Sequence, residues 1–348
     1  MRVPRRTLVL AGLAAATALE FVLVLMLGPY RVPAGDVLRV LFGEDPADPR
    51  WTVIVQEVRL PRALTAVAAG AGISAAGVQT QALFRNPLAD PYALGLSSGA
   101  SLGVAATVLG AGGTAGAFTE NLAGAGRVGV VLAAACGAAA VLLLVMLLAR
   151  RVRSTVVLLL VGVMLGSAVA AFVSVLMVYA QPENAQQFVL WSLGSFTATT
   201  WADLHVMLPA TALGLLAALL GTKTLNAHLL GDGYARSMGV NVRRSRDMVL
   251  LGTSLLAGSV TAFCGPVAFL GLAVPHLTRL ALGTSDHRVL VPGAMIGGAC
   301  LALTCALISQ PPGTEVTFPI NAVTSLFGAP LVIVLLLRRR RALRSMIS

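Results

Sequence analysis

The sequence predicts an all-α polytopic membrane protein with about ten transmembrane helices and both termini in the cytoplasm. Hydrophobic residues fill 57% of the 348 positions and charged residues only 11%, whereas a typical soluble domain carries about 25% charged residues. The mean hydropathy is +0.86. Apolar runs of about 20 residues, the length of a helix that crosses a bilayer, recur along the whole chain. We therefore expect one transmembrane domain over residues 1–348.

The first three expected spans follow a basic flank at residues 1–6. Residues 7–27 form an apolar run longer than the core of a typical signal peptide, and because many spans follow, we expect it to be retained. Residues 28–62 form a mixed loop. The second span covers residues 63–84, and after a short cytoplasmic turn the third covers residues 92–109.

The next three spans are marked by charge and by aromatic residues. The fourth covers residues 128–149 and is followed by a cluster of arginines, and the fifth covers residues 155–179. The outer segment that follows contains Trp191 and Trp201, residues that favour the membrane–water interface. It leads to the sixth span, at residues 204–220.

Residues 223–246 are the longest polar interruption in the chain and contain its single lysine. Two short helices fit inside this stretch, at residues 225–230 and 233–238, separated by a Gly-Asp-Gly sequence that breaks helices. Helices this short have no apolar face long enough to bury alone. We therefore expect a cytoplasmic segment that another protein covers.

The last four spans follow this polar segment. They are expected at residues 248–264, 266–282, 289–309 and 318–337, and a Pro-Pro-Gly turn at residues 311–313 separates the last two.

Positive charge sets the expected orientation, because cytoplasmic loops of membrane proteins are enriched in Lys and Arg. With cytoplasmic termini, six of the 25 Lys and Arg residues lie outside, which leaves 19 inside. The opposite orientation would reverse this bias. The six outer residues are Arg31, Arg39, Arg50, Arg59, Arg62 and Arg127.

Several classes of function are not indicated by this composition. The net charge of +11 is distributed between apolar spans, a pattern that favours membrane topology over nucleic-acid binding. No glycine-rich phosphate loop precedes the lysine, and the histidines show no paired spacing typical of metal ligands. We expect no enzymatic activity, cofactor or metal site. The cysteines are expected to be small core residues: Cys136, Cys264, Cys300 and Cys305.

Glu20 is the one acidic residue inside an expected span. Intramembrane carboxylates commonly serve transport, and a hydrogen bond to a neighbouring helix is an equally open interpretation. An ion-coupled secondary transporter, the main alternative class, usually has several such acids or broken helices. Glu20 alone gives that alternative little support.

Three motifs resemble the FecCD family of permease subunits of type II ABC importers. They are RNPLADPYALGLSSGASLG at residues 85–103, GPVAFLGLAVPHLTRLALGTSDHR at residues 265–288, and NAVTSLFGAPL at residues 321–331. The resemblance extends over nearly the whole chain, with ten spans in matching order. It implies a multi-pass permease of the cytoplasmic membrane that imports iron–siderophores, haem or cobalamin by alternating access.

The resemblance also implies partners and roles for individual residues. GDGYARSMGV at residues 231–240 is similar to the segment that couples the permease to a dimer of ATPase subunits. The implied coupling residues are Ala235, Arg236, Ser237, Met238, Gly239 and Val240. The implied cytoplasmic gate consists of Asn86, Leu88, Ser154 and Thr155.

VRLPRALT at residues 58–65 resembles the outer segment whose arginines, here Arg59 and Arg62, meet acidic residues of an extracytoplasmic substrate-binding protein. Charged pairs of this kind speed encounter and fix register. Anchoring to lipid head groups is the other open interpretation. The chain departs from the family pattern at Gln310, where an arginine is common, so a paralogous second permease subunit is favoured and a homodimer stays open.

The imported chelate is not specified by the sequence. The wall that span five is expected to contribute, residues 161–179, consists almost entirely of apolar or small residues. Such a wall suits a bulky chelate better than a bare ion. An iron–siderophore is the first candidate because it is the predominant substrate class of the family that the motifs resemble.

Overall fold

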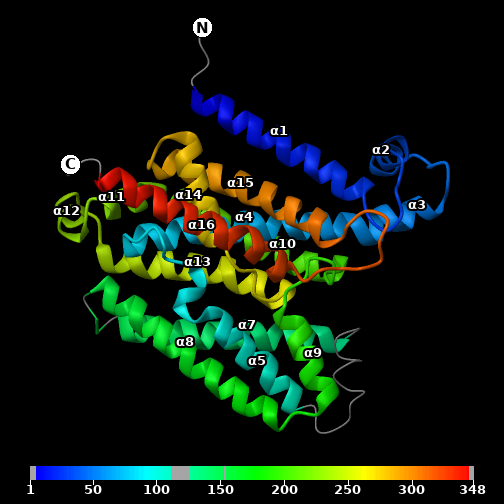
Figure 1. Ribbon diagram of the computed structural model, residues 1–348. Coiled ribbons are helices and arrows are strands. Elements are labelled where there is room, and N and C mark those ends of the chain that lie inside the picture. The colour runs from blue at the N-terminus through cyan, green and yellow to red at the C-terminus, as the bar shows by residue number, and fades with distance from the viewer. Residues whose placement is uncertain (1–4, 111–124, 150, 153, 345–348) are drawn as a thin grey trace.

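A computed structural model describes residues 5–110, 125–149, 151, 152 and 154–344, and this part of the chain is helical and without β-strands (Figure 1). Short helices occupy the two ends of the molecule, and long helices run between them. The helices are α1 (Arg5–Met26), α2 (Ala34–Phe42), α3 (Arg50–Val53), η1 (Ile54–Arg59), α4 (Leu60–Phe84), η2 (Pro91–Leu94), α5 (Leu96–Gly110), α7 (Ala125–Ala149), α8 (Thr155–Val178), α9 (Pro182–Ser192), α10 (Trp201–Leu220), α11 (Thr222–Leu229), α12 (Asp232–Ser237), α13 (Val242–Cys264), α14 (Leu270–Leu282), α15 (His287–Ser309) and α16 (Ile320–Arg344).

Helix α4 forms the centre of the structure and has nearly every one of its 25 residues buried. It contacts α10, α13, α14 and α15. Its sequence is rich in glycine and alanine, which allow helix backbones to approach closely within a membrane. A Cβ atom on Gly77 would lie 1.9 Å from the Gly271 carbonyl oxygen, and one on Gly70 would lie 2.2 Å from that of Gly298. These close approaches require glycine and set the spacing of α4 from α14 and α15.

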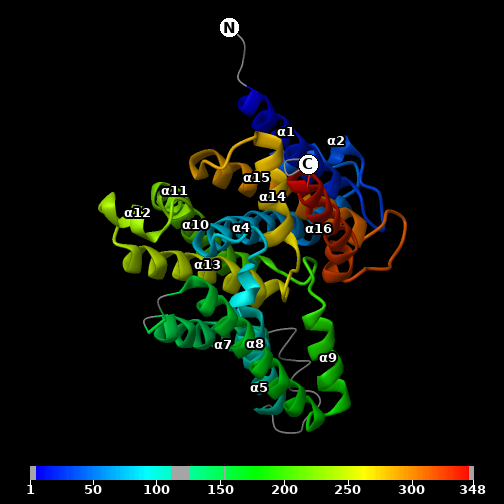
Figure 2. The same cartoon turned by 60° about the vertical axis from the view of Figure 1, so that its left-hand side comes forward.

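Helices α5, α7, α8 and α9 form a second layer, which lies below α4 and α13 in both views (Figures 1 and 2). Here too, small residues are in contact: a Cβ atom on Gly103 would lie 1.8 Å from the Ala133 carbonyl oxygen, and one on Gly99 would lie 2.5 Å from that of Gly137. Helix α13 contacts both α4 and α7. It therefore joins the two layers.

Seven helical segments within the described residues are long and apolar enough to cross a membrane. They correspond to seven of the expected spans. The other three expected spans contain shorter apolar helices: α5 has 15 residues and α14 has 13, and the apolar part of α16 is Ile320–Val334. The number of ten spans and the cytoplasmic termini therefore stay predictions.

Several boundaries differ from the sequence-based expectation, and three of them have a clear local cause. Residues 28–62 are not a loop, because α2, α3, η1 and the start of α4 lie within them. The third span begins at Leu96, since Pro91–Leu94 form a 3₁₀ turn that ends at Gly95 with φ +79°. The eighth begins at Leu270, after Gly265 and Phe269 adopt positive φ angles.

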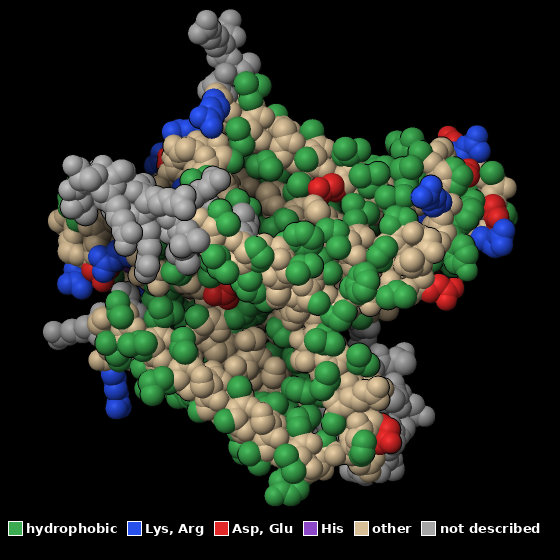
Figure 3. Space-filling view, viewed as in Figure 1, with side chains coloured by type: hydrophobic (Ala, Val, Ile, Leu, Met, Phe, Trp, Pro, Cys, Tyr) green, Lys and Arg blue, Asp and Glu red, His purple; other side chains and the backbone are tan. Residues whose placement is uncertain are grey.

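The distribution of charge follows the long axis of this bundle. On the face in Figure 3, Lys and Arg side chains lie toward the ends of the molecule, and the band between them is largely hydrophobic apart from isolated acidic side chains. Such a band fits a chain whose long helices are surrounded by lipid.

Candidate functional site

The polar segment between α10 and α13 folds into α11 and α12, close to the two short helices expected from the sequence. Figures 1 and 2 place both helices at one end of the molecule. Helix α12 lies between two glycines with positive φ, Gly231 at +96° and Gly239 at +81°. L-residues with a side chain rarely adopt this conformation. The two glycines therefore define the turns that present α12 at the surface.

One side of α12 is anchored to the rest of the chain. Ala235 is fully buried and packs in a small apolar cluster with Ala227, Val240 and Val242. The first turn of α13 is capped by Asn241, whose Oδ1 accepts a hydrogen bond from the Arg244 backbone N–H at 3.0 Å. Of the expected coupling residues, Ala235 is thus an anchor inside the segment.

The other side of α12 faces outward. Tyr234 is 56% exposed and Met238 is 59% exposed. Arg236, Ser237 and Gly239 are also exposed. Tyr234 belongs to the same motif, but it was not among the coupling residues expected from the sequence. An aromatic ring, a flexible thioether and a guanidinium group on one rigid turn form a surface suited to a protein partner.

A buried polar network attaches this segment to α13. The His228 Nε2 and Ser245 Oγ atoms are 2.7 Å apart, and the His228 Nδ1 atom lies 3.8 Å from the Asp232 carboxylate. Arg246 contacts the same carboxylate at 3.7 Å. Burial lowers the pKa of His228 below its usual 6.5, against the opposing effect of Asp232. The imidazole is therefore neutral near neutral pH.

The segment is also linked to the turn between α14 and α15. Asn226 donates a hydrogen bond from Nδ2 to Asp286 Oδ1 at 2.6 Å, and its Oδ1 accepts one from the His287 backbone N–H at 2.9 Å. Hydrogen bonds from the Arg288 backbone and from Asn226 hold the pKa of Asp286 below its usual value. Sequence reasoning missed this link, because the partners are about 60 positions apart along the chain.

The expected gate residues belong to two turns. Asn86 accepts a hydrogen bond at Oδ1 from the Leu88 backbone N–H at 3.0 Å, and Leu88 is exposed. Ser154 caps α8 by accepting a hydrogen bond from the Val157 N–H at 3.4 Å. Thr155 begins α8, and its side chain lies outside the described residues. The end of α4 and the start of α8 point toward the same end of the molecule (Figure 1).

Arg59 and Arg62, which the resemblance assigns to binding-protein docking, are buried in this chain. Each residue is only 4% exposed. Arg59 donates hydrogen bonds to the backbone carbonyls of Leu25, at 2.7 Å, and Tyr30. Arg62 donates to the Gln310 side chain and to a carbonyl of α15. The guanidinium groups are directed inward because helix ends supply unpaired carbonyls there. A role in docking stays a prediction.

Glu20 is bonded to a neighbouring helix. Its Oε1 accepts a hydrogen bond from Thr304 Oγ1 of α15 at 2.8 Å. Its other oxygen is buried and has no hydrogen-bond partner within the described part of the chain. The same part holds no group of three or more His, Cys, Asp or Glu residues placed to bind a metal ion.

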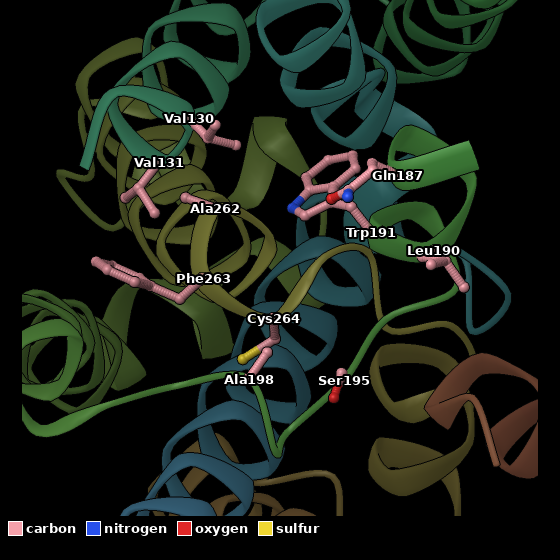
Figure 4. Close-up of a pocket in the computed structure, with 10 residues that line it drawn as sticks. All are labelled: Val130, Val131, Gln187, Leu190, Trp191, Ser195, Ala198, Ala262, Phe263 and Cys264. Carbon is pink, nitrogen blue, oxygen red and sulfur yellow. The ribbon is translucent and has the colours of Figure 1, made fainter. Parts of the chain in front are cut away.

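A cavity of about 290 Å³ lies among the start of α7, the end of α13, helix α9 and the segment after α9. Figure 4 shows Trp191 and Gln187, both from α9, beside one another at its edge, with Phe263 and Cys264 of α13 across from them. The Trp191 Nε1 atom is buried without a hydrogen-bond partner in the described chain. The cavity is mainly apolar.

Comparison with known proteins identifies the family. Residues 16–338 match the model of the FecCD transport family. The chain is 36% identical to the hemin transport system permease protein HmuU of Yersinia pestis over 87% of this chain and 88% of the relative. It is 32% identical to the vitamin B12 import system permease protein BtuC of Citrobacter koseri over 95% and 94%.

A further relative is an uncharacterized ABC transporter permease protein, YvrB of Bacillus subtilis, at 35% identity over 94% of this chain and 93% of the relative. A solved structure of a metal-chelate type ABC transporter in an inward-facing conformation matches with a TM-score of 0.82 and 28% identity, over 94% of this chain and 98% of that one. The chain is therefore a member of the FecCD transport family, a multi-pass membrane permease of the ABC-importer type.

Proposed function

We propose that this chain is the permease subunit of an importer that moves a bulky metal chelate into the cytoplasm by alternating access. Two ATPase subunits drive the movement, an extracytoplasmic binding protein delivers the chelate, and the chain resides in the cytoplasmic (inner or plasma) membrane. The permease itself performs no covalent chemistry. An iron–siderophore, haem and cobalamin all belong to the proposed substrate class, since relatives are named for hemin and vitamin B12 transport.

The observation that carries this proposal is the geometry of α12. Its exposed face, with Tyr234 and Met238, sits on a turn that Ala235 anchors and that His228 joins to α13. A partner that binds this face and moves would pull directly on a membrane helix. A surface segment attached in this way can convert ATPase closure into movement of the transport pathway.

The pathway is proposed to run between two permease subunits, lined by α8 and α16 and closed on the cytoplasmic side by Asn86, Leu88, Ser154 and Thr155. Helix α8 supports this role through a row of exposed apolar residues. That row includes Val156, Leu160, Val163, Met164, Phe172 and Val175.

The second subunit is proposed to be a paralogue, with a homodimer as the alternative. The Gln310 side chain accepts a hydrogen bond from Arg62, so an arginine at position 310 would place two guanidinium groups together. Gln310 is therefore a suitable hydrogen-bond partner for Arg62 within this chain, whereas an arginine there would be repelled. Expression with only the ATPase and binding protein decides the matter: an active complex with two copies of this chain would exclude a required paralogue.

The test of coupling is a variant with Tyr234→Ala and Met238→Ala. We expect normal membrane insertion, loss of ATPase subunit during purification, and loss of uptake of whichever labelled chelate, iron–siderophore, haem or cobalamin, the wild-type complex imports. The matched control is Lys223→Ala, which removes an exposed charge from α11 and leaves α12 unchanged. Normal ATPase content and uptake in the double variant would refute coupling through α12.

A further inference from the structure

Two neighbouring hollows lie along the seam between α7 and α13. The first, of about 610 Å³, is beside the end that carries α12 and is lined by Ala149, Val152 and residues between positions 236 and 247. The second, of about 370 Å³, lies among α7, α10 and α13 within their apolar lengths. Neither hollow contains a residue of the expected gate.

The two hollows occupy the same face of each helix. On α13, Arg243 and Asp247 line the first, and Leu251, Leu255 and Gly258 line the second. Steps of three or four residues keep side chains on one side of a helix. The apolar part continues to Phe263, 12 residues beyond Leu251 and about 18 Å along the helix axis. The two hollows therefore lie in line along the seam, one polar and one apolar, with the buried Val145 of α7 between them, and together they are called the groove.

The positions on α7 agree with this alignment. Ala149 lines the polar end, and Leu142, Ala138, Ala135 and Val131 line the apolar body. Successive positions in this set are three, four or seven residues apart, so they lie on one side of the helix. Alanine side chains are short, so this wall of the hollow leaves space between α7 and α13 for a chain of methylene groups.

The polar end of the groove is cationic. Three arginines, Arg236, Arg243 and Arg246, line it together with the Asp247 carboxylate, and Arg246 also lies 3.7 Å from the Asp232 carboxylate. Arg246 is buried and donates a hydrogen bond from Nη1 to the Val152 carbonyl oxygen at 3.3 Å. Its Nε atom is buried without a hydrogen-bond partner among the described residues. Among the described residues, three arginines against the carboxylates of Asp247 and Asp232 leave one positive charge in surplus, and with the free Nε–H group this suits a phosphate group.

We propose that the groove binds an anionic phospholipid of the cytoplasmic leaflet, with the phosphate among the arginines and one acyl chain between α7 and α13. Basic pockets between membrane helices on the cytoplasmic side bind such head groups. The apolar body distinguishes a lipid from a free phosphate ion or an acidic loop of the ATPase, because neither would fill it. The lipid would tie α12, through Arg236, to the end of α7.

The test uses the full chain, purified from phosphatidylcholine vesicles that contain a minor fraction of phosphatidylglycerol. Native mass spectrometry then counts the lipids retained. We expect wild type to retain phosphatidylglycerol selectively. Arg243→Ala should lower its occupancy about fivefold, the effect of one basic residue at an anionic membrane surface. Arg244→Ala is the matched control, since Arg244 is exposed and does not line the groove.

A second pair of variants tests the apolar body. A Cβ atom at Gly258 meets only the Ala138 Cβ, at 3.9 Å, so Gly258→Leu would enter the groove without a backbone clash and should displace the lipid. Gly12→Leu is its control, because no atom lies within 4 Å of a Cβ there.

Three outcomes would overturn the proposal. The first is equal retention of both lipids by wild type, and the second is equal lipid occupancy in Arg243→Ala and Arg244→Ala. The third is a loss in Arg243→Ala without any loss in Gly258→Leu. That third outcome, with inorganic phosphate competing for the site, would indicate a free-anion site. Loss of co-purified ATPase in Arg243→Ala with unchanged lipid would assign the arginines to the ATPase interface.

Discussion

His228 Nε2 and Ser245 Oγ lie 2.7 Å apart and join α11 to the first turn of α13. Both side chains are buried, so water does not compete for this hydrogen bond. The same imidazole lies near Asp232, at the start of α12. One neutral histidine thus connects the surface segment to a membrane helix.

Acidification should loosen this segment. Burial lowers the folded-state pKa of His228 below 6.5, so the unfolded segment binds more protons than the folded one between these two pKa values. The stability that neutral His228 gives the folded segment is therefore fully present above pH 6.5, and it is lost as pH falls through the folded pKa. Hydrogen exchange of residues 222–240 should accelerate over that range. His228→Asn should remove the pH dependence, whereas His205→Asn on α10 should retain it.

The conformation of Gly239 should matter more than its size. Its φ is +81°, and no atom lies within 4 Å of the position that a Cβ atom would take. A β-branched residue is strained there by about 1–2 kcal/mol, so Gly239→Val should disorder the end of α12 and weaken ATPase association. Gly239→Asn should be milder because Asn tolerates left-handed backbone. Gly233→Val is the control: Gly233 is equally open in space but lacks a positive φ. Equal losses in both valine variants would show that bulk is the cause.

Arg62 is expected to stabilise the folded chain, independently of any role in docking. Arg62→Leu would leave the Gln310 Oε1 and Ala306 carbonyl without their donors, an expected loss of about 1–3 kcal/mol. The melting temperature of the purified chain measures it. Arg50→Leu should leave the melting temperature unchanged, because Arg50 is exposed and pairs with Asp48 at the surface. No change in Arg62→Leu would mean that the arginine is not held inside.

Docking through Arg59 and Arg62 has a separate readout. Replacing both with lysine keeps the charge, and replacing both with glutamine removes it. If they steer the binding protein, association at low salt should be slower only for the glutamine pair, since charges act largely on encounter rates. The melting temperature of each pair must be measured in parallel. Equal association rates for the two pairs would leave these arginines a purely structural role.

Gly77 should tolerate no side chain. A Cβ there would approach the Gly271 carbonyl oxygen to 1.9 Å, so Gly77→Ala must push α4 away from α14. Overpacking of this kind costs about 1–3 kcal/mol, and the melting temperature should fall accordingly. Gly12→Ala on α1 has open space around it and should behave like wild type. A stable Gly77→Ala variant would contradict the observed helix spacing.

Hydropathy and charge in the sequence determined the all-helical membrane class and the positions of the long helices. The fifth span was expected at residues 155–179 and is Thr155–Val178; the carboxyl ends of α4, α7 and α10 were also expected where they lie. The two short helices of the polar segment were predicted too, because a glycine pair and a lack of apolar length are local properties. Such features need no knowledge of distant residues.

Only the tertiary structure determined which polar residues are exposed and which are buried. Arg59 and Arg62 were expected to meet a partner at the outer face, and in the structure each is buried and donates to a carbonyl group of another helix. Arg62 reaches Ala306, 244 positions away, and His228 reaches Ser245 on another helix. Burial of a polar group depends on partners that the fold brings together, and pairings over such separations leave no periodic signal in a single sequence.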